Sequence, residues 1–315
     1  MTYRHPHRLV ISVVALGLLG CATTSAPYVG QGPHPHITRG RPLALVDGIG
    51  WVLGVIPKIL FLNWNFDNHH ISERTEAALV RYLDSPNSAT DGTWFSLNEY
   101  APGRTLKRLV TNHKAAWPYR LLLGLPFTLV FDVLLPGRLF AGLVSGDSYN
   151  PYTDTVSIYS DISSVALHEA GHAHDFNTRR YKGTYAAIRL IPFVDLYQEF
   201  QASDEAINYL IETKQREEEF DAYKILYPAY GSYVGSHFFP PIGMLVGIGL
   251  GHVFGHTKAW ERREFYRDFD ARHTASAGVR RSLVEDARQR GAVEAPQDRS
   301  DATALTLRLA EAGTS

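Results

Sequence analysis

The chain has 315 residues, of which 45% are hydrophobic and 20% are charged, a composition typical of a globular protein with a substantial core. Its formal net charge of -1 does not supply the strongly basic surface that nucleic acid binding requires, so no nucleic acid partner is expected. The only cysteine, Cys21, excludes an internal disulfide bond.

Residues 1–21 have the pattern of an export signal. A basic flank at residues 4–8 precedes an apolar run at residues 9–19 that is too short to cross a bilayer. The run leads into a Leu-Leu-Gly-Cys sequence that ends at Cys21 and resembles the lipobox of bacterial lipoproteins. The resemblance implies cleavage before Cys21 and lipidation of its sulfur, and Ala22 after it favours the outer membrane of the cell envelope, facing the periplasm. An ordinary signal peptide with a chance cysteine is the alternative.

The predicted elements follow in chain order. Residues 22–42 are rich in Pro, Gly, Thr and His and are expected to be a flexible tether. An apolar stretch at 43–62 comes next, and then a helix at 71–84 with Ser72 as its N-cap. Further predicted elements are a strand at 94–97, a helix at 104–113, a second apolar stretch at 121–144, a turn at 149–154 and a strand at 155–159.

Asp161 is expected to cap a helix over residues 162–176, and a third apolar stretch runs from 234 to 254. The first two apolar stretches contain internal charged residues, which favours burial or an interfacial position over a membrane span. Residues 43–272 are expected to form a single domain, and residues 273–315 a charged, mobile tail. The whole pattern predicts an α+β protein, mostly helical, with short strands before the central helix.

Residues 168–172 of the predicted central helix read His-Glu-Ala-Gly-His, which matches the HExxH motif. His168 and His172 are four residues apart, so both imidazoles lie on one helical face and can reach one Zn²⁺ ion. Glu169 is offset by one residue, which directs its carboxylate to the metal-bound water, where it can act as general base. The order of strand and HExxH helix resembles the zincin metallopeptidases, whose edge strand aligns a peptide substrate. A buried helix with two packed histidines is the alternative.

Zinc needs a third protein ligand if water is to take the fourth position. The metzincin pattern would place glycine and histidine where this chain has Asp175 and Thr178, so that group is excluded. The sequence Glu-Phe-Gln-Ala-Ser-Asp-Glu-Ala that begins at Glu199 resembles the third-ligand segment of gluzincins, in particular of the CAAX-processing membrane peptidases. The resemblance implies that Glu199 is the third ligand.

The resemblance also concerns the support of a ligand. In that family the aspartate that braces a ligand histidine comes four residues after the glutamate, where this chain has Ser203. Either Ser203 or the neighbouring Asp204 is therefore expected next to a ligand histidine. Asp195 and Glu205 are alternative third ligands, and a solvent-exposed helix face without metal is the remaining interpretation of this segment.

A glycine recurs at every fourth position in the third apolar stretch. The four residues are Gly243, Gly247, Gly251 and Gly255. On a helix they form one smooth stripe that permits close packing, as in GxxxG membrane helices. The stripe favours either a helix apposed to a membrane or a closely packed buried helix, and it could also join copies of the chain into an oligomer. His252 and His256 beside the stripe are a less specific metal-binding pair.

The expected function is that of a zinc-dependent peptidase of the bacterial cell envelope, anchored by lipid, with Zn²⁺ as cofactor and peptides or unfolded envelope proteins as substrates. One alternative is a zincin-fold lipoprotein that binds metal or partners without turnover. The other is a glycine-zipper structural lipoprotein in which the HExxH motif is incidental. A tyrosine could polarise a scissile carbonyl group, and the sequence does not select among Tyr185, Tyr197, Tyr209 and Tyr223.

Overall fold

The computed structural model describes residues 23–28, 32–144 and 146–289. The predicted signal peptide, Cys21 and the last part of the predicted tail lie outside the described residues. The chain divides into two compact units, Met1–Ala259 and Trp260–Ser315. The first unit holds the sheet, the HExxH helix and every side chain of the candidate site, and its described part is mostly helical with a small sheet, which confirms the α+β class.

The sheet has five strands in the order β1-β2-β3-β5-β4. Its strands are β1 (Thr23–Tyr28), β2 (Gly32–Gly40), β3 (Trp94–Leu97), β4 (Ser148–Asn150) and β5 (Thr155–Ile158). The three inner strands β2, β3 and β5 run parallel, while β1 and β4 pair antiparallel at the two edges. The predicted strands at 94–97 and 155–159 are confirmed, and β4 occupies the start of the predicted turn.

The predicted tether at residues 22–42 is wrong. β2 is hydrogen-bonded to β3 in parallel and β1 pairs with β2, so residues 23–28 and 32–40 of this segment are part of the sheet. Ile37 is fully buried and lies in the main core cluster. The backbone ladder, buried Ile37 and the polar contacts of Thr38 with Glu99 and of Arg39 with Glu76 hold this segment, and none of them produces the hydrophobic alternation by which strands are recognised.

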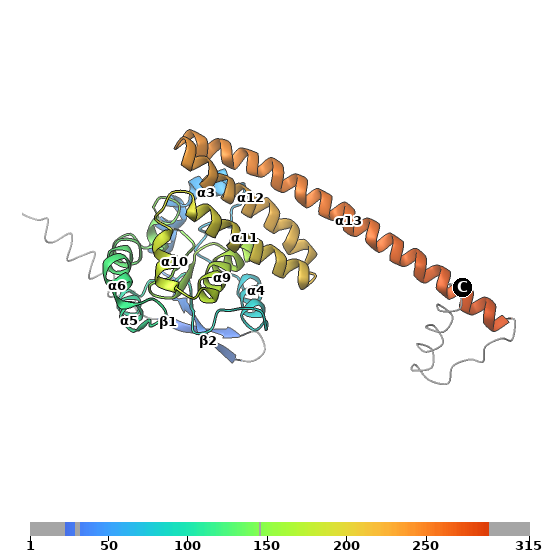
Figure 1. The fold of residues 1–315 in the computed structure, drawn as a ribbon, viewed down its shortest axis with the longest axis horizontal. Helices are drawn as coiled ribbons and strands as arrows, with labels where there is room; N and C mark the ends of the chain where they lie inside the picture. Colours follow the sequence, from blue (N-terminus) through green and yellow to red (C-terminus); the bar gives the residue numbers. More distant parts are fainter. Residues whose placement is uncertain (1–22, 29–31, 145, 290–315) are drawn as a thin grey trace, which may run out of the picture. The chain divides into compact units, whose positions relative to one another are not determined.

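Fourteen helical segments follow or separate the strands of the described chain (Figure 1). They are α2 (Ala44–Leu53), α3 (Val55–Leu60), α4 (Glu73–Leu83), α5 (Pro102–Thr111), α6 (Trp117–Tyr119), η1 (Arg120–Gly124), α7 (Leu125–Phe127), η2 (Thr128–Leu134), α8 (Gly137–Phe140), α9 (Ser163–Thr178), α10 (Lys182–Ile188), α11 (Val194–Glu212), α12 (Arg216–Phe238) and α13 (Ile242–Gln289). α13 continues through the boundary predicted at residue 272, because no proline or glycine breaker occurs there.

Helix capping agrees with the sequence at one position and differs at another. Ser72 caps α4, and its hydroxyl accepts a hydrogen bond from the Thr75 N–H at 3.5 Å. Asp161 does not cap α9, whose N-cap is Ile162 without a side-chain hydrogen bond. The Asp161 carboxylate instead accepts hydrogen bonds from the backbone N–H of Ser72 at 2.9 Å and from the hydroxyl of Ser72 at 2.7 Å. The prediction failed because a long-range partner competes for the same carboxylate.

The HExxH helix α9 lies at the centre of the first unit, against α4, α11, α12 and the strands β4 and β5 (Figure 1). Ala166, Leu167 and Ala170 are fully buried on this helix and share the main core cluster with Phe95 and Ile158 of the sheet. Small side chains on α9 let its neighbours approach closely, and a helix enclosed in this way holds its polar side chains in fixed positions.

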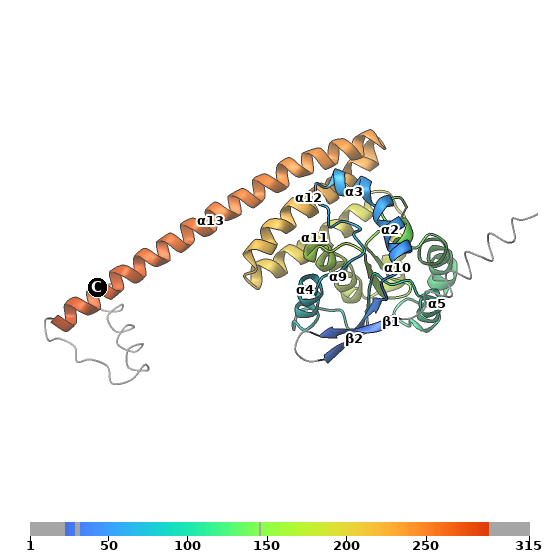
Figure 2. The ribbon, with the colours of Figure 1, turned by 180° about the vertical axis from the view of Figure 1, so that it is seen from behind.

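The glycine stripe is used within the chain. α12 and α13 form a hairpin around Pro240 and Pro241, and a Cβ on Gly247 would lie 2.0 Å from the Gly231 carbonyl oxygen of α12 (Figure 2). A Cβ on Gly243 would similarly meet backbone of α12. The two prolines end α12 and the chain reverses, so the third apolar stretch, residues 234–254, is divided between α12 and α13. The stripe already packs against its own chain, so an oligomer through that face has no free surface to use.

The second apolar stretch is not buried. Among the described residues, one helical stretch, Trp117–Leu134, is long and apolar enough to cross a membrane by length and composition, and 11% of it is buried. This stretch comprises α6, η1, α7 and η2. The shorter apolar helix Ala44–Leu53 also exposes large apolar side chains, among them Leu45 and Val52.

Candidate metal centre

α9 brings the two histidines of the motif together. The ring centroids of His168 and His172 are 4.7 Å apart, as expected for positions one helical turn apart. His168 and Glu169 are buried, and His172 is partly buried. The helix is held by core packing along its length, so the imidazoles are presented in one orientation.

A close contact between two helices adds the third side chain. A Cβ on Gly171 would lie 2.7 Å from the Ala202 carbonyl oxygen of α11, so glycine is needed where α9 and α11 cross. At this separation the Glu199 carboxylate reaches both histidines. Its Oε2 lies 3.2 Å from Nε2 of His168, and its Oε1 lies 3.4 Å from Nε2 of His172.

The three side chains form a group that could hold a metal ion. One ligand atom from each of His168, His172 and Glu199 lies within 4.8 Å of the other two. Ligands bound tetrahedrally at about 2.0–2.1 Å from Zn²⁺ are about 3.3–3.4 Å apart, which matches the two histidine–carboxylate distances. The donor set therefore fits such an ion, and the described residues contain no second group of this kind.

Ser203 lies behind the first histidine. Its hydroxyl is 3.1 Å from Nδ1 of His168, the ring nitrogen that points away from Glu199. Asp204 faces another way and accepts a hydrogen bond from the Asn208 side-chain amide at 2.9 Å. Of the two residues that the sequence left open, Ser203 therefore contacts the ligand histidine and Asp204 does not.

The two alternative third ligands have other partners. The Asp195 carboxylate lies 2.9 Å from Nε2 of His237. The Glu205 carboxylate accepts a hydrogen bond from the Tyr82 hydroxyl at 2.9 Å. Neither belongs to the three-residue group. Glu199 is the carboxylate that the fold places between the histidines.

Charge in the centre is balanced by an arginine. Arg189, at the C-terminal end of α10, forms an ion pair with Glu199, whose side chain is 2% exposed. Burial acts to raise the pKa of Glu199, but His172, His168 and Arg189 together hold it well below its usual range. Burial likewise acts to lower the pKa of His168, and the hydrogen bond and charge of Glu199 raise it overall. Glu199 is therefore a charged carboxylate, the form that binds a cation.

Glu169 and His172 face a cavity of about 230 Å³. Burial raises the pKa of the Glu169 carboxyl to about 8, with further contributions from Glu199 and Asp147, against the attraction of His168. A carboxyl whose pKa lies near neutrality is suited to take up and release a proton. The opposite walls of the cavity include Tyr149 of β4 and Phe127 of α7.

Two residues of the cavity were not found from the sequence. Arg189 and Tyr233 line it together with the ligands, although Tyr233 lies on α12, 34 positions after Glu199. The negative charge of Glu199, followed by burial, raises the pKa of Tyr233, so its hydroxyl stays protonated and can donate a hydrogen bond. Nothing local to either residue marks it, because each reaches the site through the packing of a separate helix.

The tyrosines that the sequence singled out lie in different places. Tyr185 lines the cavity, and its hydroxyl donates to Asp175. Tyr209 packs edge to face against Tyr82 in the core, and the Tyr223 hydroxyl donates to Glu219 at 3.2 Å. Tyr197 is exposed and accepts a hydrogen bond from Arg179 at 3.4 Å. Only Tyr185 of this set is positioned at the cavity.

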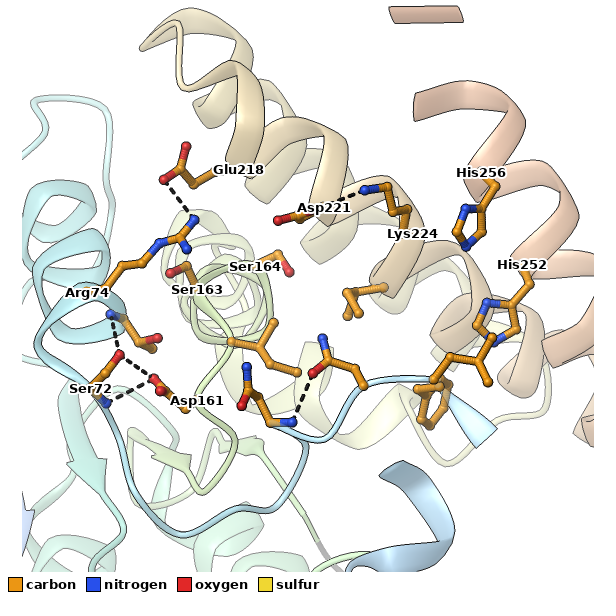
Figure 3. A pocket seen from close by; sticks show the side chains of 17 residues that line it. Ser72, Arg74, Asp161, Ser163, Ser164, Glu218, Asp221, Lys224, His252 and His256 are labelled. Atoms are coloured by element: carbon orange, nitrogen blue, oxygen red, sulfur yellow. Dashed lines mark hydrogen bonds and ion pairs between the residues drawn. The ribbon is translucent and has the colours of Figure 1, made fainter. Parts of the chain in front are cut away.

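The second histidine pair lies in a separate cavity of about 350 Å³ (Figure 3). Nε2 of His252 lies 2.9 Å from the Leu60 carbonyl oxygen, which ties α13 to α3. Figure 3 shows His256 one turn further along α13, with Asp221 and Lys224 paired to each other on the neighbouring helix. The pair does not form a metal-binding group with any carboxylate of the described chain.

Comparisons with models of protein families, with curated proteins and with solved structures gave no match for this chain. The chemistry of the centre is therefore inferred from its own side chains. These are two imidazoles and a charged carboxylate that converge on one point, with a second carboxylate beside them at a cavity.

Proposed function

We propose that the protein is a zinc-dependent peptidase of the bacterial cell envelope with a zincin-like core. The observation that carries the proposal is the convergence of His168, His172 and Glu199 beside a cavity that Glu169 also lines. Two imidazoles and one carboxylate are a ligand set used by catalytic zinc, and three protein ligands leave a position open for substrate or water. Bound zinc would supply a Lewis acid that lowers the pKa of a coordinated water to about 7.

Glu169 is the proposed general base. Its carboxylate lies in the cavity next to His172 and is not a member of the ligand group. In that position it can take a proton from the attacking water and deliver it to the leaving amine. Tyr233 lines the same cavity, and its hydroxyl is the proposed donor to the carbonyl oxygen of the scissile bond.

The sheet suggests how a peptide would be held. β4 is the outermost strand, and its residues Ser148 and Tyr149 line the cavity next to Glu169. A peptide that adds to this strand would place its backbone across the metal ligands, with main-chain hydrogen bonds aligning it. Peptides or unfolded envelope proteins are therefore the proposed substrates.

The location is proposed from the sequence. Cys21 at the end of the predicted lipobox would carry the lipid, and β1 begins two positions later at Thr23. If Cys21 is lipidated, Cys21→Ser should abolish labelling by a fatty-acid probe. Unchanged labelling would contradict the lipoprotein assignment without affecting the metal centre.

Metal content and turnover test the catalytic proposal separately. We expect about one zinc per chain, lost in His168→Ala and in Glu199→Ala, because two ligands hold the ion poorly. Asp195→Ala and Glu205→Ala serve as controls and should keep zinc, since each carboxylate is bonded elsewhere.

Glu169→Gln should keep zinc and lose turnover. Glutamine has the size of glutamate but cannot accept the proton, and loss of a general base costs about 10²–10⁴ in rate. Glu212→Gln, on the exposed end of α11, is the matched control. Equal cleavage by Glu169→Gln and wild type would refute this mechanism. Zinc binding without cleavage of any peptide by the wild type would favour the non-catalytic zincin-fold alternative.

A further inference from the structure

In the apolar helix α3, apolar side chains are exposed to solvent and the charged side chain is buried. Ile56 and Ile59 of α3 are 55% and 57% exposed, whereas Lys58 between them is 1% exposed. The Lys58 ammonium donates hydrogen bonds to the Gly54 and Asp67 carbonyl oxygens at 3.2 and 3.0 Å. A helix on a water-facing surface would turn its lysine outward and its isoleucines inward.

The stretch Trp117–Leu134 repeats this inversion. Leu122 is 70% exposed, and the stretch contains only two charged residues, Arg120 and Asp132. Asp132 accepts a hydrogen bond from the buried Asn150 side chain at 2.7 Å, and Arg120 donates to the Leu109 carbonyl oxygen at 2.8 Å. Both charges are thus satisfied by the protein, and the exposed side chains are mostly apolar.

The stretch Trp117–Leu134, the end of α10 and α12 each contribute a residue to the lining of the cavity of the metal centre. Phe127 of the apolar stretch lines the cavity, and so does Arg189, which is followed by Leu190 at 73% exposure. Tyr233 lines it from α12, whose last residue, Phe238, is also 73% exposed. α3 and the turn after α12 lie at one end of the first unit in both ribbon views, and α10 lies between that end and β1 (Figures 1 and 2). We call the exposed side chains of Ile56, Ile59, Leu122, Leu190, Phe238 and Phe239 the apolar rim.

The edge of the rim is basic. Residues 177–194 contain four cationic side chains and no aspartate or glutamate, and Arg179 and Arg189 are paired with Asp175 and Glu199, which leaves two cations at the surface. Arg180 is exposed and Lys182 is partly exposed at the start of α10, which the Tyr119–Thr184 hydrogen bond of 2.8 Å joins to α6 beside the exposed Trp117. Tryptophan, lysine and arginine beside an apolar surface are typical of the interface between lipid headgroups and acyl chains.

We infer that the apolar rim docks on a phospholipid bilayer that contains anionic lipid, so that the cavity of the metal centre opens at the membrane surface. The substrates would then be polypeptide segments that lie on the bilayer or emerge from it. This second statement rests on the proposed peptidase function, whereas the docking itself does not.

A bilayer fits the rim better than a protein partner does. The exposed apolar residues come from four separate segments. The charged groups Lys58 and Asp132 within these segments are hydrogen-bonded inside the protein, as contact with hydrocarbon requires. A protein interface would instead keep a polar rim with complementary hydrogen bonds. The chain length allows a membrane contact, because Thr23 of β1 comes two residues after Cys21, and a lipid there would hold Thr23 within about 7 Å of the headgroups, at about 3.5 Å per residue.

Site-specific fluorescence on the full chain tests the docking. Leu122→Cys and Ile56→Cys are labelled with an environment-sensitive dye, Glu212→Cys on the exposed end of α11 is the matched control, and the wild-type chain corrects for Cys21. The probe is a vesicle of phosphatidylethanolamine and phosphatidylglycerol with nitroxide-labelled acyl chains. We expect the nitroxide to quench the dye at positions 122 and 56 and to leave position 212 unchanged, and we expect the quenching to weaken in vesicles of phosphatidylcholine alone.

Two other outcomes would overturn the docking. A blue shift at position 122 that grows with protein concentration and resists the nitroxide would show that a second copy covers the rim. Equal quenching at all three positions, or quenching at none of them, would show that the apolar rim does not face the bilayer. All substituted side chains are exposed, so folding is not at issue.

The substrate statement has its own test. The double variant Ile56→Glu, Leu122→Glu should keep zinc and cleave a soluble peptide at the wild-type rate. It should cut a peptide tethered to the same vesicles at least tenfold more slowly than the wild type does. Equal loss on both peptides, or no loss on either, would refute the substrate class. If the wild type cleaves no peptide at all, the peptidase proposal fails, and the quenching experiment still decides the docking.

Discussion

The hydroxyl oxygen of Ser203 lies 3.1 Å from Nδ1 of His168, while Nε2 of the same ring faces Glu199 at 3.2 Å. The serine comes one helical turn after the glutamate, so one face of α11 both adds a ligand and orients another. Support of this kind fixes the ring and its tautomer, and its removal typically weakens metal binding about 10–100-fold. We expect Ser203→Ala to lower zinc affinity by that factor, measured by competition with a chelator.

Asp204→Ala is the matched control for Ser203→Ala. Asp204 is on the next position of α11, and its carboxylate is bonded to Asn208 and not to a ligand. Zinc affinity in this variant should equal that of the wild type. If both variants bind zinc as the wild type does, the serine contact has no role in holding the ring.

Arg189 compensates the buried negative charge of Glu199, so removing Arg189 should destabilise the metal-free protein more than the zinc-bound protein. In the metal-free protein, Arg189→Gln leaves the Glu199 carboxylate, 2% exposed, with only the histidines as partners. We expect the free energy of unfolding to fall by about 1–3 kcal/mol. Bound zinc supplies positive charge at the same carboxylate, so the zinc-induced increase in Tm should be larger than in wild type. Thermal unfolding with and without zinc measures both quantities.

Arg180→Gln is a control for the loss of a cation in the same region, since Arg180 is exposed and its guanidinium lies over the Tyr181 ring. It should change neither the free energy of unfolding nor the response to zinc. A loss of stability in Arg189→Gln that is the same with and without zinc would show that Arg189 does not act through Glu199.

The hairpin of α12 and α13 depends on backbone contact at Gly247. A Cβ at this position would lie 2.0 Å from the Gly231 carbonyl oxygen, so Gly247→Ala must push the helices apart. Overpacking of this kind costs about 1–3 kcal/mol. Gly249→Ala is the matched control, because no atom lies within 4 Å of the position that its Cβ would take, and alanine should stabilise the helix by up to about 1 kcal/mol. Chemical denaturation compares the two, and light scattering should show the same molecular mass for both.

Asp67 predicts a pH dependence of stability. Burial, with a contribution from Asp147 and against the attraction of Lys58, raises the pKa of the Asp67 carboxyl from 3.8 to about 8. Between these values the folded state binds more protons than the unfolded state, so this group stabilises the fold below about pH 4 and the stabilisation is lost as the pH rises to 8. The slope approaches about 1.4 kcal/mol per pH unit at most.

Asp67→Asn should remove that slope. Asp67 has a φ of 42°, a left-handed conformation that asparagine also adopts readily, so the backbone is retained. We expect the variant to match wild type near pH 4 and to exceed it in stability near pH 8, measured by urea denaturation across this range. The exposed Asp91→Asn is the control and should leave the profile unchanged. A wild-type profile that rises with pH in this window would contradict the assignment.

The chemistry of neighbouring residues was sufficient to predict several helices and strands from the sequence. Ser72 marked the start of α4, and the β-branched and aromatic run at 155–159 marked β5, because capping and strand formation depend on neighbours in the chain. Asp161 is an equally suitable capping residue, but its carboxylate instead accepts a hydrogen bond from Ser72, which lies 89 positions earlier in the chain. The strand β2 was missed for a related reason, since its place is set by pairing with β3 and by contacts of Thr38 and Arg39 with residues distant in the chain.

In the metal centre too, some features follow from the sequence and others only from the tertiary structure. The helical repeat alone determined that His168 and His172 share a face and that Glu169 is offset from them, since spacing along a helix is a property of the chain. The spacing of polar residues after Glu199 suggested a supporting side chain, but only the crossing of α9 and α11 at Gly171 decided that Ser203 and not Asp204 reaches the histidine. Arg189 and Tyr233 entered the cavity through tertiary packing alone. Contacts between distant helices depend on the shapes and charges of both partners, and neither segment carries that information by itself.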